Sequence, residues 1–172
     1  MANIGIIGAG SWGIALSILL YNNGNKVTVW SVIEDEIKML NEKREHERCL
    51  PGVKLPDDMV FTTDLEHTIK NADFLVLAVP SVYTRSTSKS MSGYVREGQI
   101  IVNVAKGIEE NTLKTLTQII EEEIPCADVA ALSGPSHAEE VSRSIPTTCV
   151  VAAHSRETAE YIQNIFMSEN FR

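Results

Sequence analysis

Apolar runs of strand length recur along this chain of 172 residues, separated by more polar stretches. Two of them, at 73–79 and 99–105, are continuous apolar runs without the alternation of a half-exposed strand, and 128–132 is expected to be another buried strand. Continuous runs are typical of parallel strands that are covered on both faces. Helices are expected between these strands, one of them capped by Asn111 or Thr112 and running to about 124. The pattern therefore predicts a doubly wound α/β fold with right-handed crossovers.

The beginning of the chain has the order of a βαβ unit. An apolar strand precedes the turn Gly8-x-Gly10-x-x-Gly13, a helix follows at 11–23, and a second strand follows at 26–30. A glycine turn alone also occurs in proteins that bind no ligand. Within a complete βαβ unit, it indicates a Rossmann-type, mainly parallel sheet that binds a dinucleotide.

Each glycine of this turn has an expected role. Gly8 allows the tight turn, Gly10 lets the backbone approach a pyrophosphate, and Gly13 lets the helix pack against the strand. The N-terminus of the helix then faces the anion with unpaired N–H groups and a partial positive charge. Phosphate can therefore be held without a lysine or an arginine.

Ligands of doubly wound sheets bind at the carboxyl ends of the strands. The residues that follow the predicted strands therefore form the candidate site. We expect the strand exits at 8–13, 30–33, 80–85, 106–107 and 133–138 to open on one crevice.

Two of these exits offer polar groups for a substrate. Lys106 stands between an apolar strand and Gly107, where an ammonium could bind a substrate phosphate or polarise a hydroxyl; the alternative is a solvated loop lysine. Ser136 is expected to cap a helix and to present backbone N–H groups to an anion. We interpret His137 as a surface or cap-adjacent residue, because no carboxylate is placed to orient it.

Composition narrows the class of protein. A net charge of −8 and the lack of a basic stripe argue against a nucleic-acid partner. Three scattered cysteines form neither a disulfide framework nor a metal motif, so no metal is expected. The segment 4–20 resembles a signal-peptide core, but no basic residue precedes it and glycines interrupt it. We expect a cytoplasmic protein without a membrane span.

Taken together, the motifs of the chain resemble bacterial NAD(P)-dependent glycerol-3-phosphate dehydrogenase. The resemblance spans nearly the whole chain. It rests on six segments in the same order, namely 8–16, Val29-Trp30, Cys49-Leu-Pro-Gly-Val-Lys-Leu-Pro56, Ala78-Val-Pro-Ser81, Ala105-Lys-Gly-Ile-Glu109 and Gly134-Pro-Ser-His-Ala138.

The resemblance implies reduction of dihydroxyacetone phosphate to sn-glycerol 3-phosphate with NAD(P)H, which feeds phospholipid synthesis. It places Ser11 and Trp12 along the pyrophosphate and Lys106 at both the nicotinamide and the substrate. The remaining contacts that we expect with the cofactor are Gly8, Gly10, Gly13, Ser31, Val32 and Ala138, and those with the substrate are Gly134 and Ser136.

The chain departs from the family pattern at Val32, where many bacterial members have an Arg or His that meets the ribose 2′-phosphate. Ser31 could still accept a 2′-phosphate, and Glu34 is the nearest acidic residue in sequence. We therefore expect less than about a tenfold preference between NADH and NADPH. Cys49 replaces the usual tyrosine, which is expected to alter packing rather than chemistry.

In the family, a helical second domain follows and contributes the general acid/base lysine. This chain lacks that motif, and Phe171-Arg172 matches the opening of the strand before that domain. We expect 1–172 to be the dinucleotide-binding domain, without the C-terminal helical substrate domain, and to bind dinucleotide without turnover. A homodimer is compatible with the full-length enzyme. The segment 156–167 is expected to be a helix that covers the sheet.

Two other classes of protein stay open. A non-catalytic, redox-sensing dinucleotide-binding module would share the fold, although Lys106 would then lack a purpose. A 6-phosphogluconate- or UDP-sugar-type dehydrogenase would share the glycine turn but not the segment 49–56.

Overall fold

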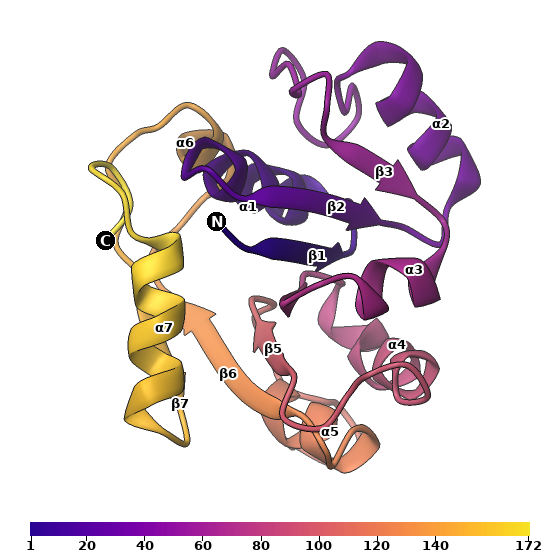
Figure 1. Ribbon diagram of the computed structural model, residues 1–172, viewed down its shortest axis with the longest axis vertical. Coiled ribbons are helices and arrows are strands. Elements are labelled where there is room, and N and C mark those ends of the chain that lie inside the picture. The colour runs from indigo at the N-terminus through magenta and orange to yellow at the C-terminus, as the bar shows by residue number, and fades with distance from the viewer.

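The computed structural model describes residues 1–172 as one sheet with helices on both sides (Figure 1). The strands are β1 (Asn3–Ile7), β2 (Lys26–Trp30), β3 (Val60–Thr62), β4 (Phe74–Leu77), β5 (Ile100–Asn103), β6 (Asp128–Ser133) and β7 (Val150–Ala153). The helices are α1 (Ser11–Asn22), α2 (Glu34–Lys43), α3 (Leu65–Lys70), the 3-10 helix η1 (Ser81–Tyr83), α4 (Thr84–Met91), α5 (Leu116–Glu123), α6 (Ala138–Ser142) and α7 (Arg156–Phe166).

The strand order is β3-β2-β1-β4-β5-β6-β7. The first six strands are parallel, and β7 adds an antiparallel edge beside β6. The order reverses between β1 and β4, which is the topological switch point of a dinucleotide-binding sheet. The predicted doubly wound, mainly parallel Rossmann-type fold is confirmed.

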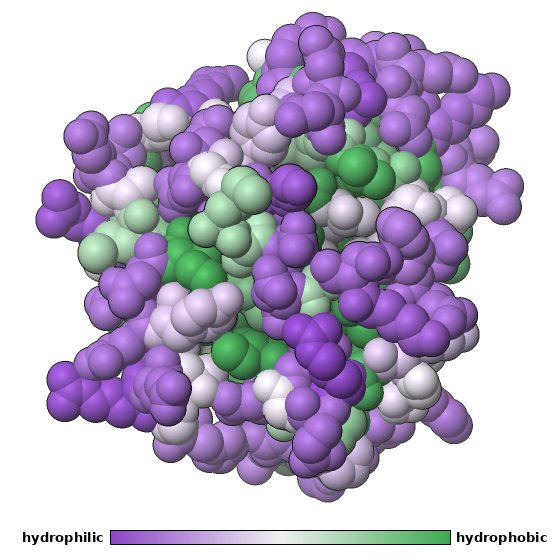
Figure 2. Space-filling view, in the orientation of Figure 1, coloured by the Kyte–Doolittle hydropathy of each residue, from purple (hydrophilic) through white to green (hydrophobic).

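The central strands are buried on both faces because successive side chains enter two different cores. In β4, for example, Phe74 and Val76 belong to a core of 28 buried residues that α1, α6 and α7 cover. Leu75 and Leu77 belong to a second core of 13 residues under α3, α4 and α5. On the face shown in Figure 2, apolar residues form separate patches among polar ones. No helix in the chain combines the length and the apolar character that a membrane crossing requires.

The predicted βαβ unit is confirmed, but the predicted start of the helix after β5 is wrong. That helix, α5, begins after Thr115, which forms a capping box with Gln118, and not at Asn111 or Thr112. The reciprocal hydrogen bonds of the box satisfy two backbone N–H groups at once. The residues before it form a short turn in which Leu113 is exposed and has a positive φ of 58°.

The end of the chain packs back on the sheet as expected. In α7, Ile162 and Phe166 are buried in the larger core. After α7, Phe171 is also buried, and its backbone lies parallel to Thr147. The backbone N–H of Cys149 donates to the carbonyl of Arg172 at 2.7 Å, so the last residues extend the sheet beside the segment that leads into β7.

Candidate functional site

The glycine turn links β1 to α1, and two of its glycines are required by packing. Gly8 has a positive φ of 116°, and a Cβ there would lie 2.9 Å from the backbone carbonyl of Ala78 at the end of β4. A Cβ on Gly13 would lie 2.1 Å from the carbonyl oxygen of Gly8. Any larger residue at either position would push α1 away from the strands. The tight turn and the close helix packing predicted for them are confirmed.

Gly10 differs from the other two because a Cβ there would meet nothing within 4 Å. Its backbone is the N-cap of α1, where no side chain caps the helix and no acidic residue occupies the first turn. The first N–H groups of a helix have no partner within the helix. The uncapped end of this twelve-residue helix therefore fits an anionic group such as a pyrophosphate.

The carboxyl ends of the strands line two adjoining cavities, of about 430 and 710 Å³. The smaller one lies between the glycine turn and the exits of β4, β5 and β6, and the larger one lies between the turn, α4 and the exit of β2. Both are lined by Gly10 and by Ala78, Val79 and Pro80. The five predicted exits therefore open on one crevice with two halves.

Lys106 lies at the smaller cavity and bridges two strand exits. Its Nζ donates to the carbonyl oxygen of Gly134 at 3.0 Å and to that of Ser136 at 3.5 Å. The side chain is exposed and lines the cavity together with Ser11 and Trp12. An ammonium group therefore stands at the end of the crevice that adjoins the uncapped helix.

The turn after β6 differs in part from the prediction. Ser136 is buried and lines the cavity, but it does not cap α6. The N-cap residue is His137, which is exposed, and its side chain makes no capping bond. The Ser136 hydroxyl bonds instead to the carbonyl of Gly134 at 3.3 Å, because the chain turns sharply there. Ala138 lines the cavity as well.

Gly134 is a predicted substrate residue that the structure places behind the cavity wall. A Cβ on it would lie 2.4 Å from the carbonyl oxygen of Thr148, so packing against the segment before β7 requires a glycine. It is absent from the residues that line the cavity. Its carbonyl oxygen accepts the hydrogen bond from Lys106, so Gly134 positions the ammonium.

An ionic cluster that sequence reasoning missed fastens the loop after Lys106. The Arg85 guanidinium on α4 donates to both carboxylate oxygens of Glu109, at 2.6 and 2.8 Å. It also bonds Glu122 and Glu123 on α5. Arg85, with help from the Thr112 hydroxyl, lowers the pKa of Glu109 to about 2. The cluster ties the Lys106 loop to α4 and α5.

The larger cavity begins at the end of β2, where Ser31 and Val32 lie in its wall as expected. The acidic residue in that wall is Glu36, on the first turn of α2, and not Glu34, the nearest in sequence. The Ser31 hydroxyl donates to Glu36 Oε2 at 2.5 Å, and the buried His46 ring lies 2.9 Å from Glu36 Oε1.

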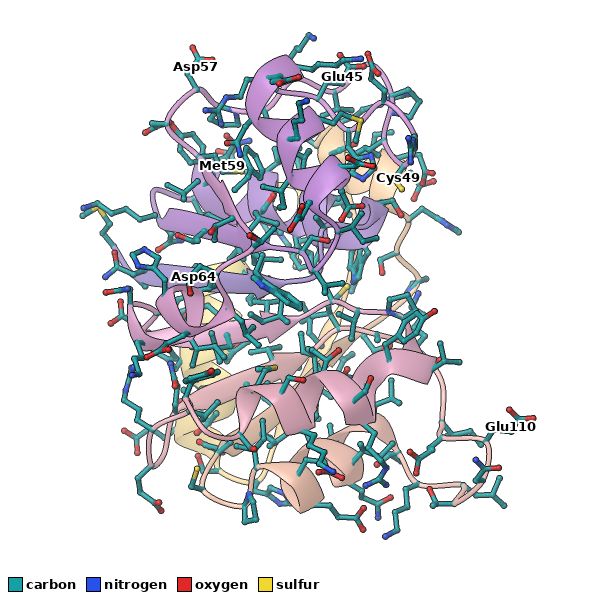
Figure 3. The ribbon with its side chains drawn as sticks, turned by 90° about the vertical axis from the view of Figure 1, so that its right-hand side faces the viewer. Glu45, Cys49, Asp57, Met59, Asp64 and Glu110 are labelled. Carbon is teal, nitrogen blue, oxygen red and sulfur yellow. The ribbon has the colours of Figure 1, made fainter.

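Cys49 lies next to α2 (Figure 3), within reach of the charge on Glu36. Desolvation raises the pKa of its thiol and the Glu36 carboxylate raises it further, while the backbone N–H of Ser11 opposes both effects. The segment that contains Cys49 therefore approaches both the N-terminus of α1 and the first turn of α2. All three cysteines are free thiols.

Comparison with known proteins identifies the family. Residues 3–159 match the family model described as NAD-dependent glycerol-3-phosphate dehydrogenase N-terminus. The whole chain aligns with a glycerol-3-phosphate dehydrogenase (NAD(P)+) of Agathobacter rectalis at 64% identity, and the alignment covers 51% of that protein. It also aligns with the enzyme of the same name from Fusobacterium nucleatum at 53% identity, and that alignment covers 52% of the relative.

A solved structure supports the same relationship. The crystal structure of glycerol-3-phosphate dehydrogenase from Coxiella burnetii superposes with a TM-score of 0.94 at 26% identity, covering 99% of this chain and 52% of that one. The chain thus spans about half the length of the curated relatives that it matches. Its sequence and its fold place it in the NAD-dependent glycerol-3-phosphate dehydrogenase family, of which it matches the N-terminal part.

Proposed function

We propose that this chain is the dinucleotide-binding domain of a glycerol-3-phosphate dehydrogenase that reduces dihydroxyacetone phosphate to sn-glycerol 3-phosphate with NAD(P)H. The observation that carries the proposal is the uncapped N-terminus of α1, which opens through Gly10 into a crevice that ends at Lys106. Under this proposal, residues 1–172 hold the cofactor. The names of its relatives supply the substrate class.

The cofactor would lie along the crevice with its pyrophosphate at the centre. The N–H groups of Ser11 and Trp12 stand at the helix end that Gly10 leaves open, so they would take the phosphates. Ser31 and Val32, in the larger cavity, would hold the adenosine ribose. Lys106 and Ala138, in the smaller one, would lie beside the nicotinamide.

When bound, the nicotinamide supplies the hydride, and the residues of this chain orient the groups around it. The Lys106 ammonium, held by two carbonyl oxygens, offers its third donor to the substrate. It would bind either the substrate phosphate or the oxygen on which charge develops during reduction. Ser136 lines the same cavity and would contact the substrate, whereas Gly134 acts through its carbonyl.

The cellular setting is part of the proposal. The three free thiols agree with a reducing cytoplasm. The net charge of −8 agrees with a small-molecule substrate rather than nucleic acid as the partner. The product would supply phospholipid synthesis, and the full-length enzyme could act as a homodimer.

Calorimetric titration of the chain with NADH tests the binding function. We expect saturable binding, and Gly10→Val should weaken it at least about tenfold, or about 1.4 kcal/mol, because the added side chain occupies the space of the pyrophosphate. Gly93→Val is the matched control. A Cβ at Gly93 also meets nothing within 4 Å, but that residue lies outside the crevice.

The two glycine variants separate a specific effect from a general loss of stability. Both should unfold at nearly the temperature of the unmodified chain, and Gly93→Val should bind NADH normally. Absence of heat with NADH at millimolar concentration would contradict the proposal. Equal affinity of Gly10→Val and the unmodified chain would do so as well.

A further inference from the structure

The wall of the larger cavity contains one charged side chain. Besides the backbone of the glycine turn, this wall consists of apolar and hydroxyl-bearing residues from the exits of β2 and β4 and from α3, η1 and α4, and it includes no lysine or arginine. The charged member is Glu36, whose side chain is 16% exposed. Whatever binds at the end of β2 therefore meets a carboxylate and no cation in the wall.

Two hydrogen bonds fix the Glu36 carboxylate. Ser31, the residue directly after β2, donates its hydroxyl to Oε2 at 2.5 Å. The same Ser31 oxygen accepts the N–H of Ile33 at 3.2 Å, which sets the direction of the hydroxyl. The strand exit and the first turn of α2 are thereby joined. Glu36 cannot swing away from the cavity without breaking this bond.

The second bond comes from His46, and the geometry determines its tautomer. The backbone N–H of Cys49 donates to His46 Nδ1 at 3.2 Å, so Nδ1 acts as an acceptor. The ring proton then resides on Nε2, which lies 2.9 Å from Glu36 Oε1 and donates to it. Since the His46 side chain is only 2% exposed, solvent does not compete for this bond.

Fixed in this way, Glu36 distinguishes two forms of the ribose that would lie at the end of β2. A free 2′-hydroxyl can donate a hydrogen bond to a remaining lone pair of the carboxylate. A 2′-phosphate adds up to two negative charges and has no hydrogen to donate near neutral pH. Placed near Glu36, it meets like-charge repulsion, and the wall offers no lysine or arginine to offset this.

The hydroxyls of α4 do not replace a cation. The side chains of Ser86 and Ser90 line the cavity, but each donates its hydroxyl to a carbonyl of its own segment, at 3.1 and 3.0 Å, and Thr87 between them offers only an uncharged hydroxyl. Val32, where a cation would best face a 2′-phosphate, is 74% exposed and apolar.

From these contacts we infer that Glu36, held by Ser31 and His46, makes the crevice select NADH over NADPH. The inference rests on the proposed function and deepens it by naming the residue that sets the cofactor preference. It revises the near-equal affinity expected from Val32 alone. Glu36 is the specificity-determining residue, and His46 is a positioning residue.

Parallel calorimetric titrations with NADH and NADPH test this inference on the unmodified chain and on two variants. The unmodified chain should bind NADH at least about tenfold more tightly. Glu36→Gln, which keeps the shape and removes the charge, should reduce this ratio at least about fivefold, chiefly by tightening NADPH. Glu34→Gln removes the same charge from an exposed residue of α2 outside the wall, and it should leave the ratio unchanged.

A third variant tests the same wall without altering Glu36. Val32→Arg places a cation in it and should tighten NADPH binding more than NADH binding, so that the ratio of the two affinities shifts towards NADPH. This variant keeps the test decisive if Glu36→Gln disturbs α2, which circular dichroism and the affinity for NADH would reveal.

The outcomes separate the inference from the proposed function. Saturable binding of NADH with equal or tighter binding of NADPH to the unmodified chain would overturn the inference and leave the proposed function standing. An equal change of the ratio in Glu36→Gln and Glu34→Gln would also overturn it, because the effect would then be one of net charge. Failure of both dinucleotides to bind the unmodified chain would overturn the proposed function itself.

Discussion

At the scale of residues, three glycines of one turn act in different ways. Gly8 and Gly13 are required by contacts under 3 Å that a Cβ would make with the chain itself, whereas Gly10 has open space in front of it. The glycine spacing in the sequence is therefore enough to predict the turn. Glu36 could not be found by the same reasoning, because it meets Ser31 only through the path of the chain into α2, and His46 comes from a loop without a periodic pattern.

Lys106 allows a prediction at the same scale. In a protein that joins this chain to the second half of the Agathobacter rectalis enzyme, Lys106→Met should reduce turnover of dihydroxyacetone phosphate by about 30- to 1000-fold. This range corresponds to about 2–4 kcal/mol for a lost charge-assisted contact in the transition state. Steady-state kinetics with NADH would measure kcat and KM separately.

The two constants decide what Lys106 does. A loss in kcat indicates that Lys106 stabilises charge in the transition state. A rise in KM alone indicates that it binds the substrate phosphate. Unchanged values of both would show that the side chain is only a solvated lysine, despite its bonds to the exits of β6.

At the scale of elements, the apolar pattern predicted the buried strands and α1. Local hydrogen bonds and ion pairs set the start of α5 and the position of the loop before it. The start of α5 is set by the capping box of Thr115 and Gln118, which overrides the apolar spacing that favoured an earlier start. The edge strand β3 has only three residues, and β7 is partly exposed along its length, so neither has the fully buried apolar run of β4. The α4–loop–α5 cluster around Arg85 joins groups that lie far apart in sequence.

That cluster gives the protein a pH-dependent component of stability. Because the folded-state pKa of Glu109 is about 2 against an ordinary value of 4.5, its ion pair stabilises the fold above pH 4.5 and is lost as the pH falls towards 2. Glu109→Gln should therefore lower the melting temperature near neutral pH. The difference from the unmodified chain should shrink as the solution is acidified.

Glu110→Gln is the matched control for this prediction, since that side chain is exposed, makes no ion pair and projects from the same loop into solvent (Figure 3). Thermal unfolding followed by circular dichroism measures both variants. Equal melting temperatures for the two, or a Glu109 effect that persists undiminished at acid pH, would contradict the role assigned to the cluster.

At the scale of the whole molecule, the sheet separates two ends with different chemistry. The amino ends of the strands border a cavity of about 530 Å³ in which some of the polar side chains already have partners. Asn25, for instance, bonds to the backbone of Ala2 and Leu20, and Tyr21 bonds to Asp58. The carboxyl ends border the crevice, where the uncapped N-terminus of α1 and the ammonium of Lys106 face the same space. The carboxyl ends therefore offer an anionic dinucleotide an uncapped helix N-terminus and a cation in one crevice.

A crystal structure of this chain grown with NADH would show which end of the sheet binds the dinucleotide. We expect the pyrophosphate at the N–H groups of Ser11 and Trp12, the adenosine ribose beside Glu36, and the nicotinamide beside Lys106. A dinucleotide bound in the cavity at the amino ends of the strands, or bound in the crevice with its pyrophosphate away from α1, would overturn the proposed site.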